Sequence, residues 1–214
     1  VGTDVLRTVV ERMRQEIIGL GGTFHFSTKV TDLHIKDGKI SAIELNHKEW
    51  KVVSGVVLAI GHSARDTFQM LYERQIPMAA KSFAVGMRVE HPQQMINESQ
   101  YGTGADMTLL PTAAYKVTHQ ASNGRGVYSF CMCPGGYVVN ASSEENCLAV
   151  NGMSYRKRDS HNANSAIIIS VTPADFPDKE HPLSGVAFQR MLEEKTWKLA
   201  EGKVPQQLYG DFKQ

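Results

Sequence analysis

The chain has 214 residues, of which 42% are hydrophobic and 21% charged, and these proportions exclude a disordered or fibrous protein. Its 23 basic and 22 acidic residues give a net charge of +1, so the composition predicts neither a nucleic-acid partner nor a membrane partner. The longest apolar runs, Gly55 to Gly61 and Ala166 to Ile169, are far shorter than the roughly 18 residues that a membrane-spanning helix needs. Three cysteines, Cys131, Cys133 and Cys147, are an odd number in a chain large enough to bury a core without disulfides, which favours a reducing, cytoplasmic setting.

The first 77 residues combine helical and strand patterns. Apolar residues at helical spacing predict a helix that starts from an N-cap at Thr3 or Asp4 and ends at a glycine cluster, residues 19–22. Residues 56–60 are continuously apolar, as in a strand covered on both faces, and they lead through Gly61 into a helix of about ten residues from Arg65. Four further strands are predicted, the last three as an antiparallel meander with an Asp37-Gly38 hairpin turn: residues 23–26, 30–35, 40–46 and 50–53.

Pro77 marks a change to longer strands and loops, so a domain boundary is predicted near residue 77. Residues 81–90 alternate strictly between apolar and other side chains, which places Arg88 and Glu90 on the same face of a strand. The remaining predicted elements are strands of a mostly antiparallel sheet and one helix: residues 114–119, 126–133, 137–141 and 166–171, and helix 184–201.

Neither glycine cluster fits the dinucleotide-binding pattern Gly-x-Gly-x-x-Gly. The cluster at 19–24 follows a helix and ends in Phe24, and the cluster at 102–107 follows no strand and ends in Met107. A Gly-x-x-x-x-Gly-Lys-Ser/Thr loop is also absent from the sequence. By itself, therefore, the chain carries no phosphate-binding fingerprint.

The segment Gly61-His62-Ser63-Ala64-Arg65 is one residue short of the nucleophile elbow Gly-x-Ser-x-Gly. Arg65 replaces the second glycine, and no acid followed by a histidine stands downstream in the expected order. A serine hydrolase that uses Ser63 is therefore a minor alternative, and Ser63 is predicted to be the N-cap of the helix that follows.

Cys131 and Cys133 stand two residues apart ahead of a Pro134-Gly135-Gly136 turn, on one face if the segment is extended. The Cys-x-Cys spacing, the distant Cys147 and the scattered histidines predict no metal site. Small buried cysteines are the favoured interpretation, and a reactive thiol at Cys133 is the alternative. The Arg88 and Glu90 pair could orient a substrate or bond across the sheet, and bonding across the sheet is favoured.

The predicted helix, strand, meander and apolar strand ending in Ala59-Ile60-Gly61 resemble the later half of a glutathione-reductase-type FAD-binding domain. Five motifs are similar to those of the bacterial FAD-utilizing dehydrogenases, and they span most of residues 1–171: Gly2-Thr3-Asp4, Val57 to Asp66, Lys81 to Pro92, Cys131 to Gly136, and Asn151 to Ser154.

The resemblance implies an α/β plus α+β fold class. Residues 1–77 would be part of a Rossmann-like FAD-binding domain with a three-stranded β-meander, and residues 78–214 an inserted, mostly antiparallel substrate domain. By the family's pattern, Val30 would contact adenine through its backbone, and Ala59, Ile60 and Gly61 would pass near the ribose or diphosphate. The glycine-rich element of such domains is not in this sequence, so the chain is expected to be an internal fragment that binds FAD weakly or not at all and is inactive alone.

The resemblance also implies a function for the complete protein: an FAD-dependent oxidoreductase of unknown substrate, in which the flavin carries out the redox step. Cys133 and Arg88 are the candidates for side chains near the flavin or substrate. Its partners would be a small-molecule substrate and a nicotinamide nucleotide or another electron partner. The alternative from a different class is a binding or interaction module with no chemistry of its own.

Overall fold

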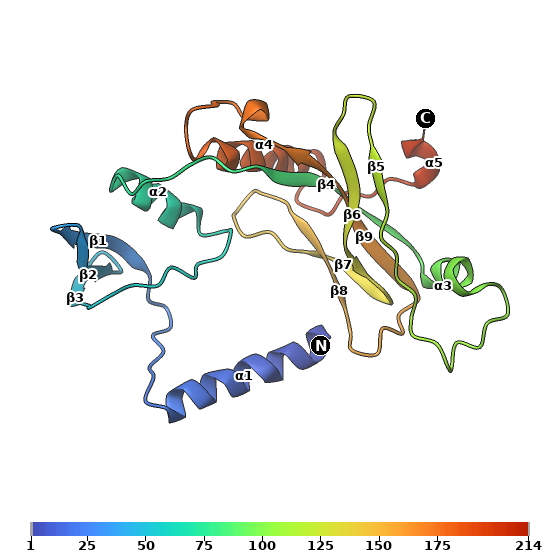
Figure 1. Cartoon of the computed structure of the whole chain (residues 1–214), viewed down its shortest axis with the longest axis horizontal. Helices are drawn as coiled ribbons and strands as arrows, with labels where there is room; N and C mark the ends of the chain where they lie inside the picture. Colours follow the sequence, from blue (N-terminus) through green and yellow to red (C-terminus); the bar gives the residue numbers. More distant parts are fainter. Residues whose placement is uncertain (1, 214) are drawn as a thin grey trace.

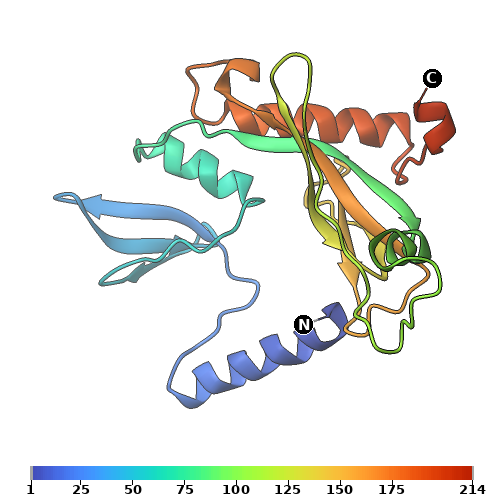
Figure 2. The same cartoon turned by 45° about the vertical axis from the view of Figure 1, so that its right-hand side comes forward.

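The computed structural model describes residues 2–213. It contains three antiparallel sheets, ordered β1-β2-β3, β4-β9-β6-β5 and β7-β8, and Figures 1 and 2 show the first of them set apart from the other two. The helices and strands in chain order are α1 (Thr3–Gly19), β1 (Val30–Lys36), β2 (Lys39–Leu45), β3 (Glu49–Val52), α2 (Arg65–Glu73), β4 (Phe83–Pro92), α3 (Gln93–Tyr101), β5 (Thr118–Gln120), β6 (Gly126–Cys133), β7 (Gly136–Asn140), β8 (Val150–Ser154), β9 (Asn162–Val171), η1 (Pro173–Asp175), α4 (Ser184–Leu199) and α5 (Tyr209–Phe212).

Helix α1 forms where the apolar periodicity predicts it, but its N-cap is Gly2 rather than Thr3 or Asp4. The carbonyl of Gly2 accepts the first helical hydrogen bonds, from the amides of Val5 and Leu6. Asp4 is already inside the helix, and its Oδ1 accepts a hydrogen bond from the distant backbone amide of Arg156. None of the residues of α1 is buried.

The predicted meander is confirmed as β1, β2 and β3, with the tight turn at Asp37-Gly38. Helix α2 packs against β1, and this part of the chain buries Leu33 and Leu71 to 4% and 6% exposure. An ion pair between Arg74, at the end of α2, and Asp32 of β1 ties the two elements together. The meander and α2 therefore form one small packed unit.

Two of the predicted strands are wrong. Residues 23–26 and 56–60 form no strand, and Val57 is 92% exposed rather than covered on both faces. An extended segment becomes a strand only when a neighbour satisfies its backbone groups, and no described segment lies beside either of these to do so. Every strand pair among the described residues is antiparallel, so the Rossmann-like arrangement is not confirmed.

Helix α2 starts at Arg65 as predicted, but Ser63 is not its N-cap. The cap position is Ala64, which makes no side-chain hydrogen bond to the helix. Ser63 contributes only its backbone carbonyl, which accepts from the amide of Arg65.

The second half of the chain confirms the mostly antiparallel sheet, in which β9 pairs along its length with β4 and also with β6. One face of β4 packs aromatic rings, since the ring of Phe83 lies 5.2 Å from that of Phe176 and 6.2 Å from that of Phe188 in α4. The hairpin of β7 and β8 packs against β4, β6 and β9. Because side chains alternate along a strand, Arg88 and Glu90 lie on the face of β4 opposite to Phe83.

The chain exposes 15430 Å² of surface, against about 9,800 Å² expected for a compact monomer of this mass. Part of the excess comes from α1, none of whose residues is buried and which Figure 2 shows standing apart from the sheets along most of its length.

Candidate functional site

Arg88 and Glu90 of β4 both reach side chains on the neighbouring strand β9, so the prediction of bonding across the sheet is confirmed. The Nε of Arg88 donates to Asn164 Oδ1 at 3.0 Å. The Nδ2 of Asn162 donates to Glu90 Oε1 at 2.6 Å. The register of β4 against β9 therefore places the side chains of Arg88 and Glu90 at the same end of the sheet.

The guanidinium of Arg88 has only neutral acceptors around it. Besides Asn164, it donates to the carbonyl of Cys131 at 2.7 Å, to Asn151 Oδ1 at 3.3 Å and to Cys133 Sγ at 3.7 Å. Among the described residues no carboxylate forms an ion pair with it. A half-buried cation without a counterion attracts an anionic group, because its charge is only partly compensated by neutral dipoles.

Strand β8 lies against this guanidinium at Gly152. A Cβ built on Gly152 would be 2.2 Å from Nη2 of Arg88 and 2.2 Å from Oδ1 of Asn164. A side chain at this position would displace Arg88, so the glycine is part of what holds the arginine in place.

The structure brings the two predicted catalytic candidates, Arg88 and Cys133, into contact. Burial raises the pKa of the Cys133 thiol, and the positive charge of Arg88 opposes that rise without cancelling it. The thiol is therefore protonated at neutral pH, and it donates to the carbonyl of Cys131 at 3.4 Å. In this arrangement Cys133 is a weak hydrogen-bond donor rather than an activated nucleophile.

The prediction that Cys131 and Cys133 are buried together on one face is wrong for Cys131, which is exposed. A register shift between Phe130 and Cys133 interrupts the pairing of β6 with β9, and Cys131 takes a φ of 45°. The bulge turns the Cys131 side chain outward and leaves its carbonyl pointing at Arg88.

Polar groups continue beneath Arg88 into the sheet. Asn164 and Ser165 are completely buried, and the Nδ2 of Asn164 has no hydrogen-bond partner among the described residues. His91 contacts the hydroxyl of Tyr115 through Nε2 at 2.9 Å, while its Nδ1 is also buried without a partner. Burial raises the pKa of Tyr115, so its phenol is neutral at physiological pH. Unpartnered buried polar atoms beside a cation are typical of a site that binds a polar molecule.

The predicted cofactor contacts lie elsewhere in the chain, and no hydrogen bond joins them to Arg88 or Cys133 among the described residues. Val30 begins β1, whereas Ala59, Ile60 and Gly61 lie in the exposed segment that leads to α2. Gly61 has a φ of 70°, and a Cβ built there would meet no atom within 4 Å. The backbone at Gly61 is therefore uncovered on the side where a side chain would stand.

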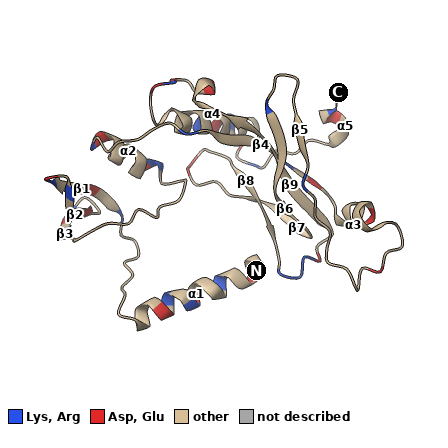
Figure 3. Ribbon diagram, viewed as in Figure 1, with Lys and Arg blue, Asp and Glu red and all other residues tan. Residues whose placement is uncertain are grey.

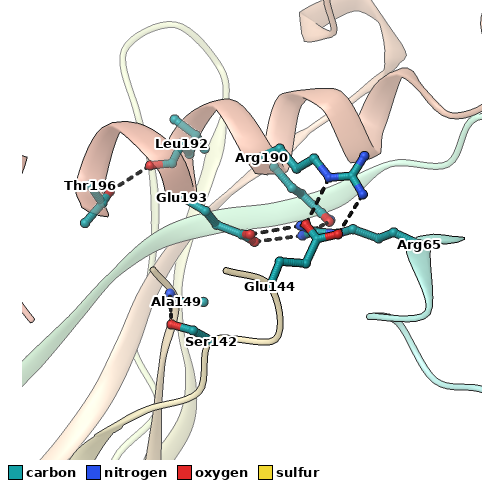
Figure 4. Close-up of polar contacts among 9 residues, drawn as sticks. Arg65, Ser142, Glu144, Ala149, Arg190, Leu192, Glu193 and Thr196 are labelled. Atoms are coloured by element: carbon teal, nitrogen blue, oxygen red, sulfur yellow. Dashed lines mark hydrogen bonds and ion pairs between the residues drawn. The ribbon is translucent and has the colours of Figure 1, made fainter. Parts of the chain in front are cut away.

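A second polar cluster joins α2 to α4 and to the segment between β7 and β8 (Figure 4). The sequence alone did not reveal it. Arg65, whose side chain is 3% exposed, donates to both carboxylate oxygens of Glu193 at 2.8 and 2.9 Å and also pairs with Glu144. Arg190 donates to the other side of Glu144 at 2.6 and 2.9 Å. These charges lower the pKa of Glu144 to about 2. The cluster is a network of ion pairs that ties α2 to α4 and to the segment between β7 and β8, although the buried Nε of Arg65 has no hydrogen-bond partner among the described residues.

Glu144, Cys147 and Glu193 place three potential metal ligands within 4.8 Å of one another, the one such group among residues 2–213. Both carboxylates already bind arginines, and burial raises the pKa of the Cys147 thiol. A cation here would compete with guanidinium groups for the same oxygens, so the arrangement is explained by the ion pairs alone.

Ser63 takes part in no hydrogen bond through its hydroxyl among the described residues, and no histidine bonds to it. The geometry therefore gives no support to a serine nucleophile.

Comparison with known proteins places this geometry in a family context. The model of the family described as "FAD-dependent protein, C-terminal domain-like" matches residues 82–214, which include all of the Arg88 cluster. An uncharacterized protein of Clostridium beijerinckii (strain ATCC 51743 / NCIMB 8052) is 50% identical over 215 residues, which cover 99% of this chain. The aligned region is 40% of that relative, so the chain spans about two fifths of its length.

No helix within residues 2–213 has both the length and the apolar character needed to cross a bilayer.

Proposed function

Because the chain belongs to the family of FAD-dependent proteins that share this C-terminal-domain-like region, we propose that the complete protein is an FAD-dependent oxidoreductase and that residues 78–214 form its substrate-side domain. The observation that carries this proposal is the half-buried guanidinium of Arg88, which has neutral acceptors only and lies inside the matched region. When bound, FAD would supply the two-electron redox chemistry that the side chains of this chain cannot provide.

Arg88 would hold an anionic group of the substrate. The acceptors Asn164, Asn151 and the Cys131 carbonyl fix the plane of its guanidinium. A fixed planar donor binds a carboxylate with defined orientation, which positions the rest of a small molecule.

Cys133 would line this site as a neutral thiol beside Arg88. Its pKa is raised by burial, so the proposed role is a contact with the substrate and not covalent catalysis. The buried amide of Asn164 would contribute its unpartnered Nδ2 as a further hydrogen-bond donor.

Val30 and the segment Ala59-Ile60-Gly61 would contact FAD from the other half of the chain. Their support is the open backbone around Gly61, where a bound ligand could approach closely. The proposal for these residues concerns binding only.

The test uses the full-length protein. It should purify with bound flavin, visible in its absorbance spectrum, and the flavin should be reduced by NADH, NADPH or another electron donor. Arg88→Met should keep the flavin spectrum but lose turnover with acidic substrates by about 100-fold, because a charge-assisted contact is removed. Lys179→Met, which removes an exposed cation of the same domain, should leave turnover unchanged.

A full-length protein purified without flavin that also fails to bind added FAD would contradict the proposal and favour a non-catalytic binding module. Turnover that is equal in Arg88→Met and Lys179→Met would contradict the role given to Arg88 while leaving the flavin assignment intact.

A further inference from the structure

A cavity of about 500 Å³ lies between the amino end of α1 and the segment that joins β8 to β9. Three consecutive basic residues, Arg156, Lys157 and Arg158, line it together with Gly2 and Thr112. Figure 3 shows the basic segment in blue, directly beside the amino end of α1.

The three cations are not neutralised by neighbouring acids. Among the described residues, none of the three forms an ion pair with a carboxylate, whereas the arginines at 65, 74, 125 and 190 all do. The carboxylate of Asp4 accepts a hydrogen bond at 2.9 Å from the backbone amide of Arg156, which lines the cavity. Counting Asp4 against the three cations still leaves an excess of positive charge, so the cavity attracts anions.

The basic segment is held in place by close backbone contacts. A Cβ built on Gly2 would lie 1.9 Å from the amide nitrogen of Arg156, and one built on Gly135 would lie 1.9 Å from the carbonyl oxygen of Arg158. The hydroxyl of Thr112 donates to the same carbonyl at 3.2 Å. Arg158 takes a φ of 55°, an uncommon conformation for a residue with a side chain. These contacts hold the backbone that carries the three cations in one position beside the cavity.

We propose that this cavity is a phosphate subsite, which binds a phosphate or diphosphate group of a small molecule. Two guanidinium groups and one ammonium group around one cavity match a group that carries two or more negative charges on several oxygens, whereas a single carboxylate needs one cation. The flavin diphosphate or a phosphorylated substrate or nicotinamide nucleotide could supply this group, and the binding chemistry is the same for each.

The phosphate subsite lies next to the Arg88 cluster without overlapping it. Gly135, in the turn after β6, abuts the carbonyl of Arg158, and the positive charge of Arg158 acts on Cys133 to lower its pKa. The turn that follows Cys133 therefore packs against the backbone of the segment that lines the cavity. This inference goes beyond the proposed redox function, because it assigns phosphate binding to residues that the redox role does not use.

The test is calorimetric titration of the full-length protein with sodium pyrophosphate at low and high NaCl. Lys157→Gln should weaken binding about tenfold, and the double variant Arg156→Gln/Arg158→Gln should weaken it about 100-fold, since each removes charge-assisted hydrogen bonds. The matched control Lys51→Gln removes an exposed cation of β3 that has no carboxylate partner among the described residues, and it should bind like the wild type. Binding should fall as NaCl rises, because salt screens the attraction.

Absence of pyrophosphate binding to the wild type, or equal affinity in Lys157→Gln and Lys51→Gln, would overturn the phosphate subsite. If the double variant does not fold, the exposed single variant Lys157→Gln decides the question, with Lys157→Arg expected to retain binding. Titration of flavin-loaded and flavin-free protein then separates the sources: competition identifies the flavin diphosphate, and unchanged affinity identifies a phosphorylated substrate or a nicotinamide nucleotide. Both titrations measure binding alone, so neither depends on whether the bound flavin is reduced and reoxidised.

Discussion

Residues 2–77 and residues 82–213 contain similar kinds of elements but bury very different amounts of their apolar surface. In α1 the side chains of Val10, Met13 and Ile17 are 56%, 57% and 44% exposed, although they lie on its apolar face. In residues 82–213, by contrast, Ala163 and Val171 of β9 are 0% and 3% exposed. The family model matches residues 82–214, the half in which the strands pack against one another.

The difference teaches that local sequence is sufficient to define a helix or a hairpin, whereas burial requires a partner surface. The periodicity of α1 and the turn at Asp37-Gly38 act over a few residues, and both elements form. The apolar residues 56–60 would need strands beside them, and they remain extended and exposed. An exposed apolar surface of this extent marks a region that contacts other parts of a protein or a partner.

The largest predicted effect comes from a comparison of two ion pairs. One is buried and joins the two halves of the chain, and the other is exposed and lies within α1. Arg65→Ala should lower the free energy of unfolding by about 3 kcal/mol, because it leaves the carboxylates of Glu193 and Glu144 without their buried partner. Arg7→Ala, in an α1 pair whose side chains are 87% and 52% exposed, should cost less than about 0.5 kcal/mol. Urea unfolding followed by circular dichroism measures both, and equal losses would contradict the contrast.

Glu144→Gln should lower the free energy of unfolding at pH 7 by about 1.5 kcal/mol, through loss of charged hydrogen bonds to Arg65 and Arg190. The pKa of Glu144 falls from 4.5 to about 2 on folding, so the stability that its charge provides is fully present above pH 4.5 and lost as the pH falls towards 2. Wild type and variant should therefore converge in stability over this range. A difference that stays constant from pH 5 to 2 would show that the Glu144 charge is not the source.

Gly152→Ala should lower the free energy of unfolding by about 1 to 3 kcal/mol, because the added methyl group overlaps Arg88 and Asn164. Gly19→Ala is the matched control, since a Cβ there meets no atom within 4 Å and alanine favours the helical conformation of α1. Thermal melts should show a lower midpoint for Gly152→Ala alone. Equal midpoints would mean that Arg88 moves aside without cost.

The smallest predicted effect is at the turn before α2. Gly61→Val should cost about 1 kcal/mol, since valine is strained at a φ of 70°. Ser63→Ala should be neutral within about 0.5 kcal/mol, because the Ser63 hydroxyl does not cap the helix. A larger loss for Ser63→Ala than for Gly61→Val would place the start of the helix at Ser63.

Elements with a strong local pattern could be predicted from the sequence, and those without one could not. Helix α3 was missed because Gln93–Tyr101 is mostly polar and follows β4 without a break, and β8 was missed because Val150–Ser154 is short and contains Asn151 and Gly152. Both elements are fixed by contacts: the side chain of Gln93 bonds to Ala113 and Gly135, and β8 pairs with β7.

The candidate site could be predicted only in part for the same reason. Alternation along β4 correctly placed Arg88 and Glu90 on one face, but the contact of Arg88 with Cys133 spans 45 residues and depends on how β4 and β6 each pair with β9. The Arg65 cluster spans 128 residues to Glu193. One local signal pointed to it: an arginine at the first position of a helix is unfavourable next to the helix dipole unless acidic groups lie nearby.

The contact between Asp4 and Arg156 also sets the order of events during synthesis. The two residues are 152 positions apart, so a ribosome adding about 5 to 20 residues per second needs roughly 8 to 30 s to deliver the second after the first. During that interval the hydrogen bond from Arg156 is not yet available to position the amino end of α1. The contact orients the helix without covering it, since the apolar side chains of α1 stay exposed after the contact has formed.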